Sequence, residues 1–123
     1  MKIAPLKKKD SIPSEQSSKI FDIIRRKYVT LTPEEWVRQH IIHYLVNEKK
    51  VPASLFAVEK ILKVNQLSRR TDVLIYKDIK PVLLVECKSP DVKINQHVFD
   101  QAARYNLSLS VKYFILTNGL QTV

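Results

Sequence analysis

The stretch PVLLVECK, residues 81–88, is a run of apolar residues that ends in a carboxylate, a thiol and an ammonium. A run this apolar is typical of a strand buried inside a sheet, where charged side chains are rarely left unpaired. Side chains alternate between the two faces of a strand, so Glu86 and Lys88 should project to one face and Cys87 to the other. The sheet is therefore expected to present an acid and an amine together at the end of a buried strand.

A second apolar run, TDVLIYK (residues 71–77), comes just before this strand. The two runs predict a β-hairpin that turns around Asp78-Ile79. Asp72 then lies on the face of Glu86 if the connecting loop, for instance Lys77 to Pro81, has an odd number of residues, or if a β-bulge shifts the pairing. An even loop without a bulge would put Asp72 on the wrong face, so we expect one of these two arrangements.

The rest of the sequence predicts an α/β fold. Thr32-Pro33-Glu34-Glu35 combines an N-cap, a proline at the first helical position and a glutamate three residues after the cap, which predicts a helix that ends near Lys49-Lys50. The apolar patterns predict a strand over residues 55–66, a helix over 95–109 and a strand over 112–119. Residues 18–29 fit either a short helix or a strand. Three successive strands and a helical crossover to a fourth give a mixed central β-sheet flanked by helices, with the element order αβββαβ.

Composition also predicts how the chain is divided. Residues 1–18 are polar, basic and interrupted by proline, so we expect a flexible basic N-terminal arm. Residues 19–123 have the usual size of a single domain. Asn118-Gly119 is a strong hairpin-turn signal close to the end of the sequence. Either a C-terminal return strand is missing from this sequence or the turn ends the domain.

Charge and residue counts narrow the function. Lys and Arg outnumber Asp and Glu by 21 to 12, a formal net charge of +9, which favours nucleic acid as a partner, then an anionic membrane surface, with simple solubility as the third explanation. A P-loop or a dinucleotide-binding loop needs at least two glycines, and Gly119 is the only glycine in the sequence. Both kinds of nucleotide-binding loop are therefore excluded within this sequence. Cys87 is the only cysteine and no segment has membrane-spanning length, so we expect a cytoplasmic protein without disulfides.

Two carboxylates that converge on one point repel each other and favour a divalent cation between them. Oxygen donors suit Mg²⁺, which keeps several waters and accepts phosphate oxygens, and Mn²⁺ is the expected substitute. A neighbouring ammonium can orient a metal-bound water and offset the charge that develops on a phosphate. Asp72, Glu86 and Lys88 beside a basic surface therefore predict hydrolysis of phosphodiester bonds.

The ordered set Asp72, Glu86-x-Lys88 and Gln101-x-x-x-Tyr105 resembles the PD-(D/E)xK nuclease superfamily. Within it, the sequence is similar to the N-terminal endonuclease domain of type I restriction enzyme R subunits over roughly residues 30–120, through the segments VEKILKVN, RRTDVLIY, LLVECKSP, FDQAARYN and YFILTNGL. Thr71 stands where the superfamily name has proline. Large members of the group also carry a translocating ATPase, which this sequence lacks. The resemblance implies a free-standing or excised nuclease module with a restriction-endonuclease-like core.

The resemblance also implies a role for each residue of the set. Asp72, Glu86 and the backbone carbonyl of Cys87 would ligate Mg²⁺, and Lys88 would serve the attacking water. Gln101 and Tyr105 are four residues apart on one helix face and would complete the site. Ordinary core packing is the alternative for Tyr105, and a surface amide is the alternative for Gln101.

Other residues extend the predicted site. The superfamily often supplies a further acid from its first helix, and Glu35 is our choice, with Glu34 as the alternative; the helix cap explains Glu35 without any chemistry. Arg69 and Arg70, just before the first acid of the set, are expected to contact DNA phosphates, which position nucleic acid without reading its sequence. Arg104 either reaches a phosphate or is a solvated surface residue.

Two functions from different classes remain open. The first is a metal-dependent DNA endonuclease, and the second is a catalytically inactive nucleic-acid-binding or assembly module of the same fold. A membrane-surface protein ranks below both because no basic amphipathic helix is present. The expected partners are DNA and either restriction-modification subunits or a separate ATPase, and a homodimer would supply the two sites that two-strand cutting usually needs.

Overall fold

The computed structural model describes residues 15–16, 18–64 and 66–123. The basic arm expected over residues 1–18 lies almost entirely outside the described residues. The elements in chain order are β1 (Glu15–Gln16), β2 (Lys19–Asp22), β3 (Lys27–Thr30), α1 (Pro33–Asn47), η1 (Ala53–Leu55), β4 (Phe56–Val58), β5 (Ile61–Val64), β6 (Leu67–Arg70), β7 (Val73–Lys77), β8 (Lys80–Cys87), α2 (Gln96–Asn106), η2 (Leu107–Leu109) and β9 (Tyr113–Thr117).

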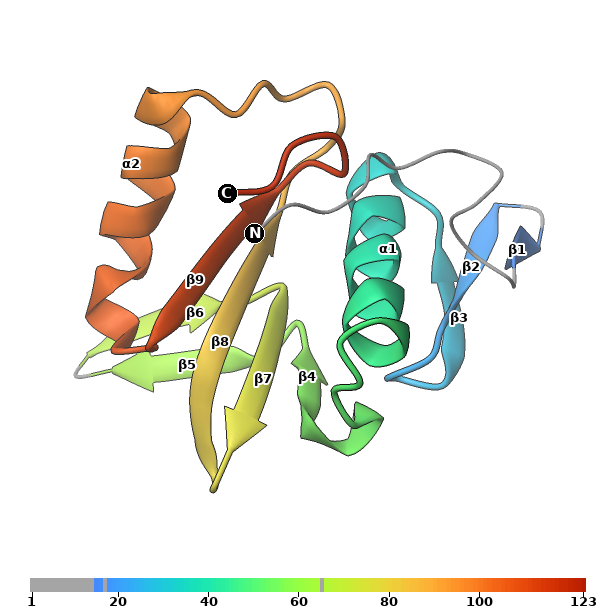
Figure 1. Ribbon diagram of the computed structural model, residues 1–123, viewed down its shortest axis with the longest axis horizontal. Coiled ribbons are helices and arrows are strands. Elements are labelled where there is room, and N and C mark those ends of the chain that lie inside the picture. Colours follow the sequence, from blue (N-terminus) through green and yellow to red (C-terminus); the bar gives the residue numbers. More distant parts are fainter. Residues whose placement is uncertain (1–14, 17, 65) are drawn as a thin grey trace.

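The centre of the molecule is a four-stranded sheet with the strand order β4-β7-β8-β9 (Figure 1). β4, β7 and β8 are antiparallel neighbours, and β9 runs parallel to β8 after the crossover through α2. Two smaller sheets accompany it, β1-β2-β3 and the hairpin β5-β6. The mixed α/β fold with the αβββαβ core is confirmed, with the β5-β6 hairpin inserted between its first and second strands.

The two long helices cover opposite faces of the central sheet (Figure 1). On one face, α1 packs its apolar stripe Val37, Ile41, Ile42 and Leu45 against Val73, Ile75, Val85 and Cys87. On the other face, α2 and η2 cover Leu74, Leu84 and Leu116. Each fully buried aliphatic side chain stabilises the fold by about 1.5–3 kcal/mol. Because side chains alternate along β8, Glu86 and Lys88 belong to the α2 face and Cys87 to the α1 face.

A β-bulge sets the register of the β7-β8 hairpin. The turn has two residues, Asp78-Ile79, so the odd-length loop expected over Lys77 to Pro81 is wrong. A register shift near the middle of β7 gives β8 one extra residue, which confirms the alternative of a bulge. Beyond the bulge, the pairing brings Asp72, the residue before β7, across from Glu86. The bulge therefore does what the odd loop was expected to do.

The single strand expected over residues 55–66 is wrong, because the chain breaks into β4 and β5. Glu59 adopts a left-handed backbone conformation with φ of 54° at the break. Thr71 holds the bend, since its N–H and its hydroxyl donate to the Lys60 carbonyl oxygen at 2.9 and 2.7 Å. β5 therefore leaves the central sheet and pairs with β6. Residues 18–29, which fitted a helix or a strand, contribute the antiparallel strands β2 and β3.

The helix boundaries differ from the expected ones by a few residues. The Thr32 hydroxyl accepts a hydrogen bond from the Glu35 N–H at 3.0 Å, so α1 begins as predicted, but it ends at Asn47, before the two lysines. The helix expected over 95–109 is α2 followed by the short η2. After the Asn118-Gly119 turn the chain comes back against β9, where Leu116 and Val123 exchange two backbone hydrogen bonds of 3.0 and 2.9 Å.

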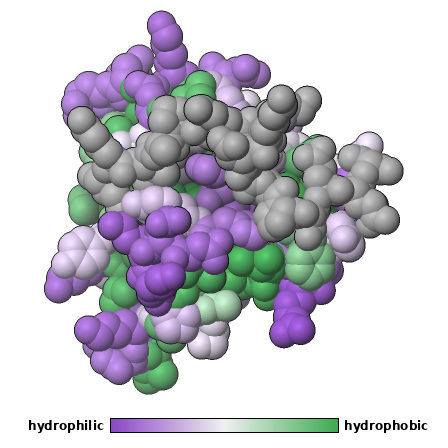
Figure 2. Space-filling view, turned by 45° about the vertical axis from the view of Figure 1, so that its right-hand side comes forward, coloured by the Kyte–Doolittle hydropathy of each residue, from purple (hydrophilic) through white to green (hydrophobic). Residues whose placement is uncertain are grey.

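None of the helices in the described part of the chain is long and apolar enough to cross a bilayer. Figure 2 shows hydrophilic residues around an apolar area on one face of the molecule. Folded proteins commonly expose apolar surface of this kind, so the area alone assigns no partner.

Candidate functional site

Asp72 lies at the end of the central sheet, beside Arg38 of α1 and the backbone of β8. Its Oδ2 accepts a hydrogen bond from the Cys87 backbone N–H at 2.8 Å, and its Oδ1 accepts one from the Arg38 guanidinium of α1 at 3.2 Å. Burial raises the pKa of Asp72 above its ordinary value of 3.8; the bonds from Cys87 and Arg38 offset part of that rise, and the carboxylates of Glu86 and Glu34 add to it. The Asp72 carboxyl group is thus held in place by two hydrogen bonds, and two other carboxylates lie near it.

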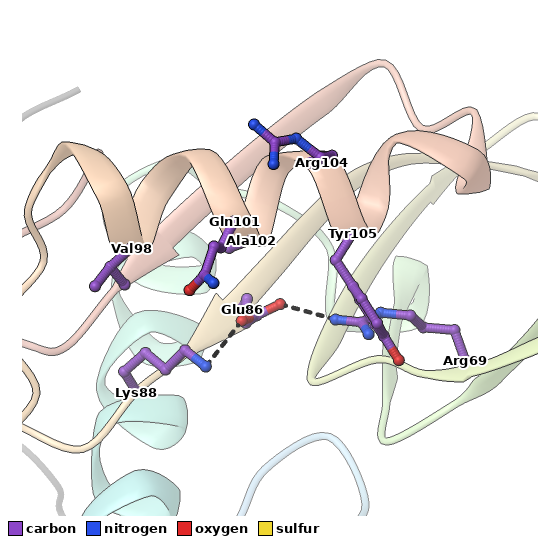
Figure 3. Close-up of a pocket in the computed structure, with 8 residues that line it drawn as sticks. All are labelled: Arg69, Glu86, Lys88, Val98, Gln101, Ala102, Arg104 and Tyr105. Carbon is purple, nitrogen blue, oxygen red and sulfur yellow. Dashed lines mark hydrogen bonds and ion pairs between the residues drawn. The ribbon is translucent and has the colours of Figure 1, made fainter.

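Glu86 lies near the end of β8 and Lys88 directly follows this strand, and both side chains lie on the side of α2 (Figure 3). The Lys88 ammonium lies 3.1 Å from Glu86 Oε2. Arg69 and Asn106 donate to the other oxygen, Oε1, at 3.2 and 3.0 Å. Both oxygens of Glu86 are therefore held by donors from three elements, β6, α2 and the segment after β8.

Two adjoining pockets meet at Glu86 and Lys88. The smaller, of about 160 Å³, brings together Asp72, Glu86, Lys88 and Cys87. The larger, of about 500 Å³, lies between the end of β8 and α2. Arg69, Glu86 and Lys88 line both. The three side chains expected to converge do line one pocket, although the chemical role of each is still a prediction.

α2 contributes Gln101 and Tyr105 to the larger pocket (Figure 3). The Gln101 amide points down from the helix toward Glu86 and Lys88. Tyr105 is 61% exposed, so ordinary core packing is wrong for this residue. Its ring stacks on the Arg69 guanidinium, whose central carbon lies 3.2 Å from the ring centroid. Arg104 also lines the pocket, but Figure 3 shows its guanidinium extending to the outer side of the helix.

The first helix offers Glu34, rather than Glu35, to the smaller pocket. Glu35 is 8% exposed and belongs to a buried ion-pair cluster, in which it accepts from Arg25, Arg38 and Gln39 at 3.2, 3.2 and 3.0 Å. The alternative named for this position therefore lines the same pocket as Asp72, and our first choice does not. Glu35 is linked to the pocket indirectly, because Arg38 contacts both Glu35 and Asp72.

The ion-pair cluster ties the β2-β3 hairpin to the site. Arg25 bonds Asp22 at 2.7 Å and Glu59 at 3.1 Å in addition to Glu35. Burial raises the pKa of Asp22, but hydrogen bonds from Arg25 and from the Ile24 N–H outweigh burial and leave that pKa below its ordinary value. Asp22 is thus held ionised at the turn between β2 and β3.

Of the two basic residues expected to contact phosphates, Arg70 is the more exposed, and it lines the smaller pocket. Arg69 is half-buried and already engaged by Glu86, by Tyr105 and by the Asn106 side-chain oxygen at 2.9 Å. Arg70 is therefore exposed beside the acids, whereas the Arg69 guanidinium is already held by Glu86 and Asn106.

Sequence reasoning missed Asn106 and Arg38, which position the two carboxylates. Asn106 is buried and joins three partners, Arg69, Glu86 and the Ala102 carbonyl oxygen, the last at 2.8 Å. Nothing in its spacing marks it, because it follows Tyr105 directly and belongs to no known pattern. Arg38 carried a weak signal, since an arginine three residues after Glu35 on an otherwise apolar face requires a buried partner.

The donor set of the smaller pocket fits a hard divalent cation. Mg²⁺ is usually bound by one or two carboxylates together with waters and substrate phosphates, and Asp72 and Glu86 supply the carboxylates. Across residues 15–16, 18–64 and 66–123, no group of three or more His, Cys, Asp or Glu side chains is arranged to hold a metal ion. The Cys87 thiol is buried on the opposite face, and burial raises its pKa well above the ordinary value, so only its backbone is available to a cation.

Comparison with known proteins identifies one family. Residues 33–123 match the sequence profile of a family described as the type I restriction enzyme R protein N terminus. The matched region contains α1, the central sheet and α2, and it includes every residue of both pockets. A comparison with curated protein sequences gives no significant match.

Proposed function

The chain belongs to the family of type I restriction enzyme R protein N termini, and we propose that it is a nuclease module that hydrolyses phosphodiester bonds of DNA with a bound divalent cation, in the manner of the PD-(D/E)xK superfamily. The observation that carries the proposal is that Asp72, Glu86 and Lys88 line one small pocket at the ends of two paired strands. Two acids can hold a cation that activates a water, and an ammonium beside them can orient that water.

In this proposal Asp72 and Glu86, with the Cys87 carbonyl, would hold Mg²⁺, for which Mn²⁺ would substitute. The bound ion would lower the pKa of a water and polarise the phosphate. Lys88 orients the attacking water, because its ammonium already lies 3.1 Å from Glu86 and reaches the pocket. Arg38 and Asn106 are positioning residues that keep the two carboxylates in place.

DNA is the proposed substrate, and the charge of the chain supports this choice. The formal net charge of +9 favours a polyanion, and Arg70 is exposed beside the pocket that holds the acids. The proposed protein partners are other restriction-modification subunits or a separate ATPase that delivers DNA. A second copy of the chain would provide the second site for cutting both strands.

One observation favours the alternative, an inactive nucleic-acid-binding or assembly module. Each oxygen of Asp72 and Glu86 already accepts from a protein donor, namely the Cys87 N–H, Arg38, Arg69, Asn106 or Lys88. The acids are thus satisfied without a cation, as they would be in a purely structural role. In a nuclease, the cation would have to bind beside these donors or displace Arg69 or Lys88 from Glu86.

Nicking of supercoiled plasmid with Mg²⁺ or Mn²⁺ tests the proposal. We expect metal-dependent nicking by the wild type and a loss of roughly 100-fold or more in Asp72→Asn and Lys88→Met, because each removes a charge that acts on the reacting phosphate or its cation. Lys93→Met is the matched control, since Lys93 is an exposed lysine outside both pockets. DNA binding without nicking in either metal would establish the inactive module instead.

A further inference from the structure

The larger pocket is not needed for metal binding, yet it opens directly beside the predicted reaction centre. Its volume of about 500 Å³ is within the range of small-molecule binding sites, and it shares Glu86, Lys88 and Arg69 with the smaller pocket. Val98 and Ala102 of α2 provide apolar lining (Figure 3). A purely ionic ligand such as a phosphate gains nothing from apolar walls, so another part of the substrate is expected there.

An aromatic platform forms one side of this pocket. The Tyr105 ring is 61% exposed and stacks on the guanidinium of Arg69. That guanidinium cannot rotate freely, because Asn106 and Glu86 hold it at 2.9 and 3.2 Å. Tyrosine and arginine thus form a pre-organised pair of planar groups, the type of surface on which nucleobases stack.

Gln101 adds a hydrogen-bonding side chain to this pocket. Its amide points toward Glu86 and Lys88 in the pocket (Figure 3). An amide offers two donors and one acceptor, so it can pair with the edge of a base. The pocket therefore combines a stacking surface, apolar walls and an adaptable hydrogen-bonding group.

We infer that the larger pocket binds one unpaired nucleobase of the DNA strand whose phosphate lies at Glu86 and Lys88. Two cations, Arg69 and Lys88, face the pocket beside one carboxylate, which suits the phosphates on either side of the base. Bases of an intact duplex are stacked and paired, and extruding one has a free-energy cost that an unpaired base avoids. The module therefore prefers DNA with unpaired nucleotides over continuous duplex.

The inference rests on the proposed function for the position of the phosphate, but its test does not require cleavage. Fluorescence anisotropy in EDTA compares binding of a labelled oligo-dT, the same strand with an abasic nucleotide, and the matching duplex. We expect Tyr105→Ala to weaken single-strand binding by roughly 5- to 150-fold, the range for one stacked base, and to change duplex binding little. Tyr105→Phe keeps the ring and should bind as the wild type does.

Tyr113→Ala is the matched control. Tyr113 is also an exposed tyrosine, 58% exposed, with the Lys112 ammonium 5.3 Å from its ring centroid, but it lies outside the pocket. Gln101→Ala should reduce the differences in affinity among oligo-dT, oligo-dC and oligo-dA. Equal losses for single strand and duplex in Tyr105→Ala, or the same loss in Tyr113→Ala, would overturn the inference.

The two proposals fail in different ways. Nicking of plasmid without any single-strand preference leaves the nuclease and removes the base pocket. A Tyr105-dependent single-strand preference without metal-dependent nicking leaves the base pocket on an inactive module. Thermal unfolding of each variant separates a lost contact from a lost fold, and Tyr105→Phe keeps the ring test valid if Tyr105→Ala does not fold.

Discussion

Replacing Arg38 with glutamine tests the buried ion-pair cluster that holds Asp72. Arg38 is 6% exposed, and its guanidinium bonds Glu35 at 3.2 Å, Glu59 at 3.4 Å and Asp72 at 3.2 Å. Removing one partner of a buried ion pair typically costs about 3–5 kcal/mol because a charge is left uncompensated. The lower end applies here, since Glu35 keeps Arg25 and Asp72 keeps the Cys87 N–H. We expect a loss of about 3 kcal/mol.

Urea unfolding followed by circular dichroism measures this loss. At a slope of about 2 kcal/mol per molar urea, a loss of 3 kcal/mol lowers the midpoint by roughly 1.5 M. Arg26→Gln is the control, because Arg26 is exposed next to the cluster and a surface change should stay within about 0.5 kcal/mol. Combining Arg38→Gln with Glu35→Gln should recover part of the stability, since the uncompensated charge is gone. A midpoint for Arg38→Gln equal to that of Arg26→Gln would refute a stabilising role for the cluster.

Three further predictions concern single residues. Burial keeps the pKa of Asp72 above 3.8, so the folded state binds this proton more tightly than the unfolded state does. The free energy of unfolding of the wild type relative to Asp72→Asn should therefore fall as pH rises from 3.8 through the raised pKa. Urea titrations at a series of pH values measure this difference, and a difference that does not change with pH would contradict the burial argument. Asn106→Ala removes side-chain bonds to Arg69, Glu86 and a backbone carbonyl and should cost about 2 kcal/mol in urea unfolding, whereas a neutral result would mean that water replaces the amide. Ile79 is 94% exposed with φ of 62°, so Ile79→Gly should stabilise the hairpin by about 0.5–1 kcal/mol in thermal or urea unfolding, and Ile79→Ala should give no such gain.

Local sequence signals predicted the parts of the fold that depend on neighbouring residues. Thr32 and Glu35 mark the start of α1 because a cap is built from residues three apart. The alternation in residues 81–88 places Glu86 and Lys88 on one face because a strand has a fixed period of two. The turn at Asp78-Ile79 was located because it separates two neighbouring apolar runs, but its length relative to the pairing of the strands was not predicted.

Features set by contacts between distant residues could not be predicted in this way. Glu59 takes a left-handed conformation because the chain is held there by Thr71 and Asp72, far along the sequence, and this break separates β4 from β5. The bulge in β8 likewise follows from fitting β7 against it. At the site, Asn106 belongs to no pattern, and the assignment of Glu34 to the pocket depends on how α1 is rotated on the sheet.

The proposed nuclease depends on one divalent cation bound by Asp72 and Glu86 together, and electron paramagnetic resonance of added Mn²⁺ measures this binding. We expect the wild type to bind Mn²⁺ and Asp72→Asn and Glu86→Gln each to lose this binding. Asp91→Asn should retain it, because Asp91 is an exposed acid outside both pockets. Equal Mn²⁺ binding by the wild type and by the double variant Asp72→Asn/Glu86→Gln, or no binding by the wild type, would contradict the proposed cation site.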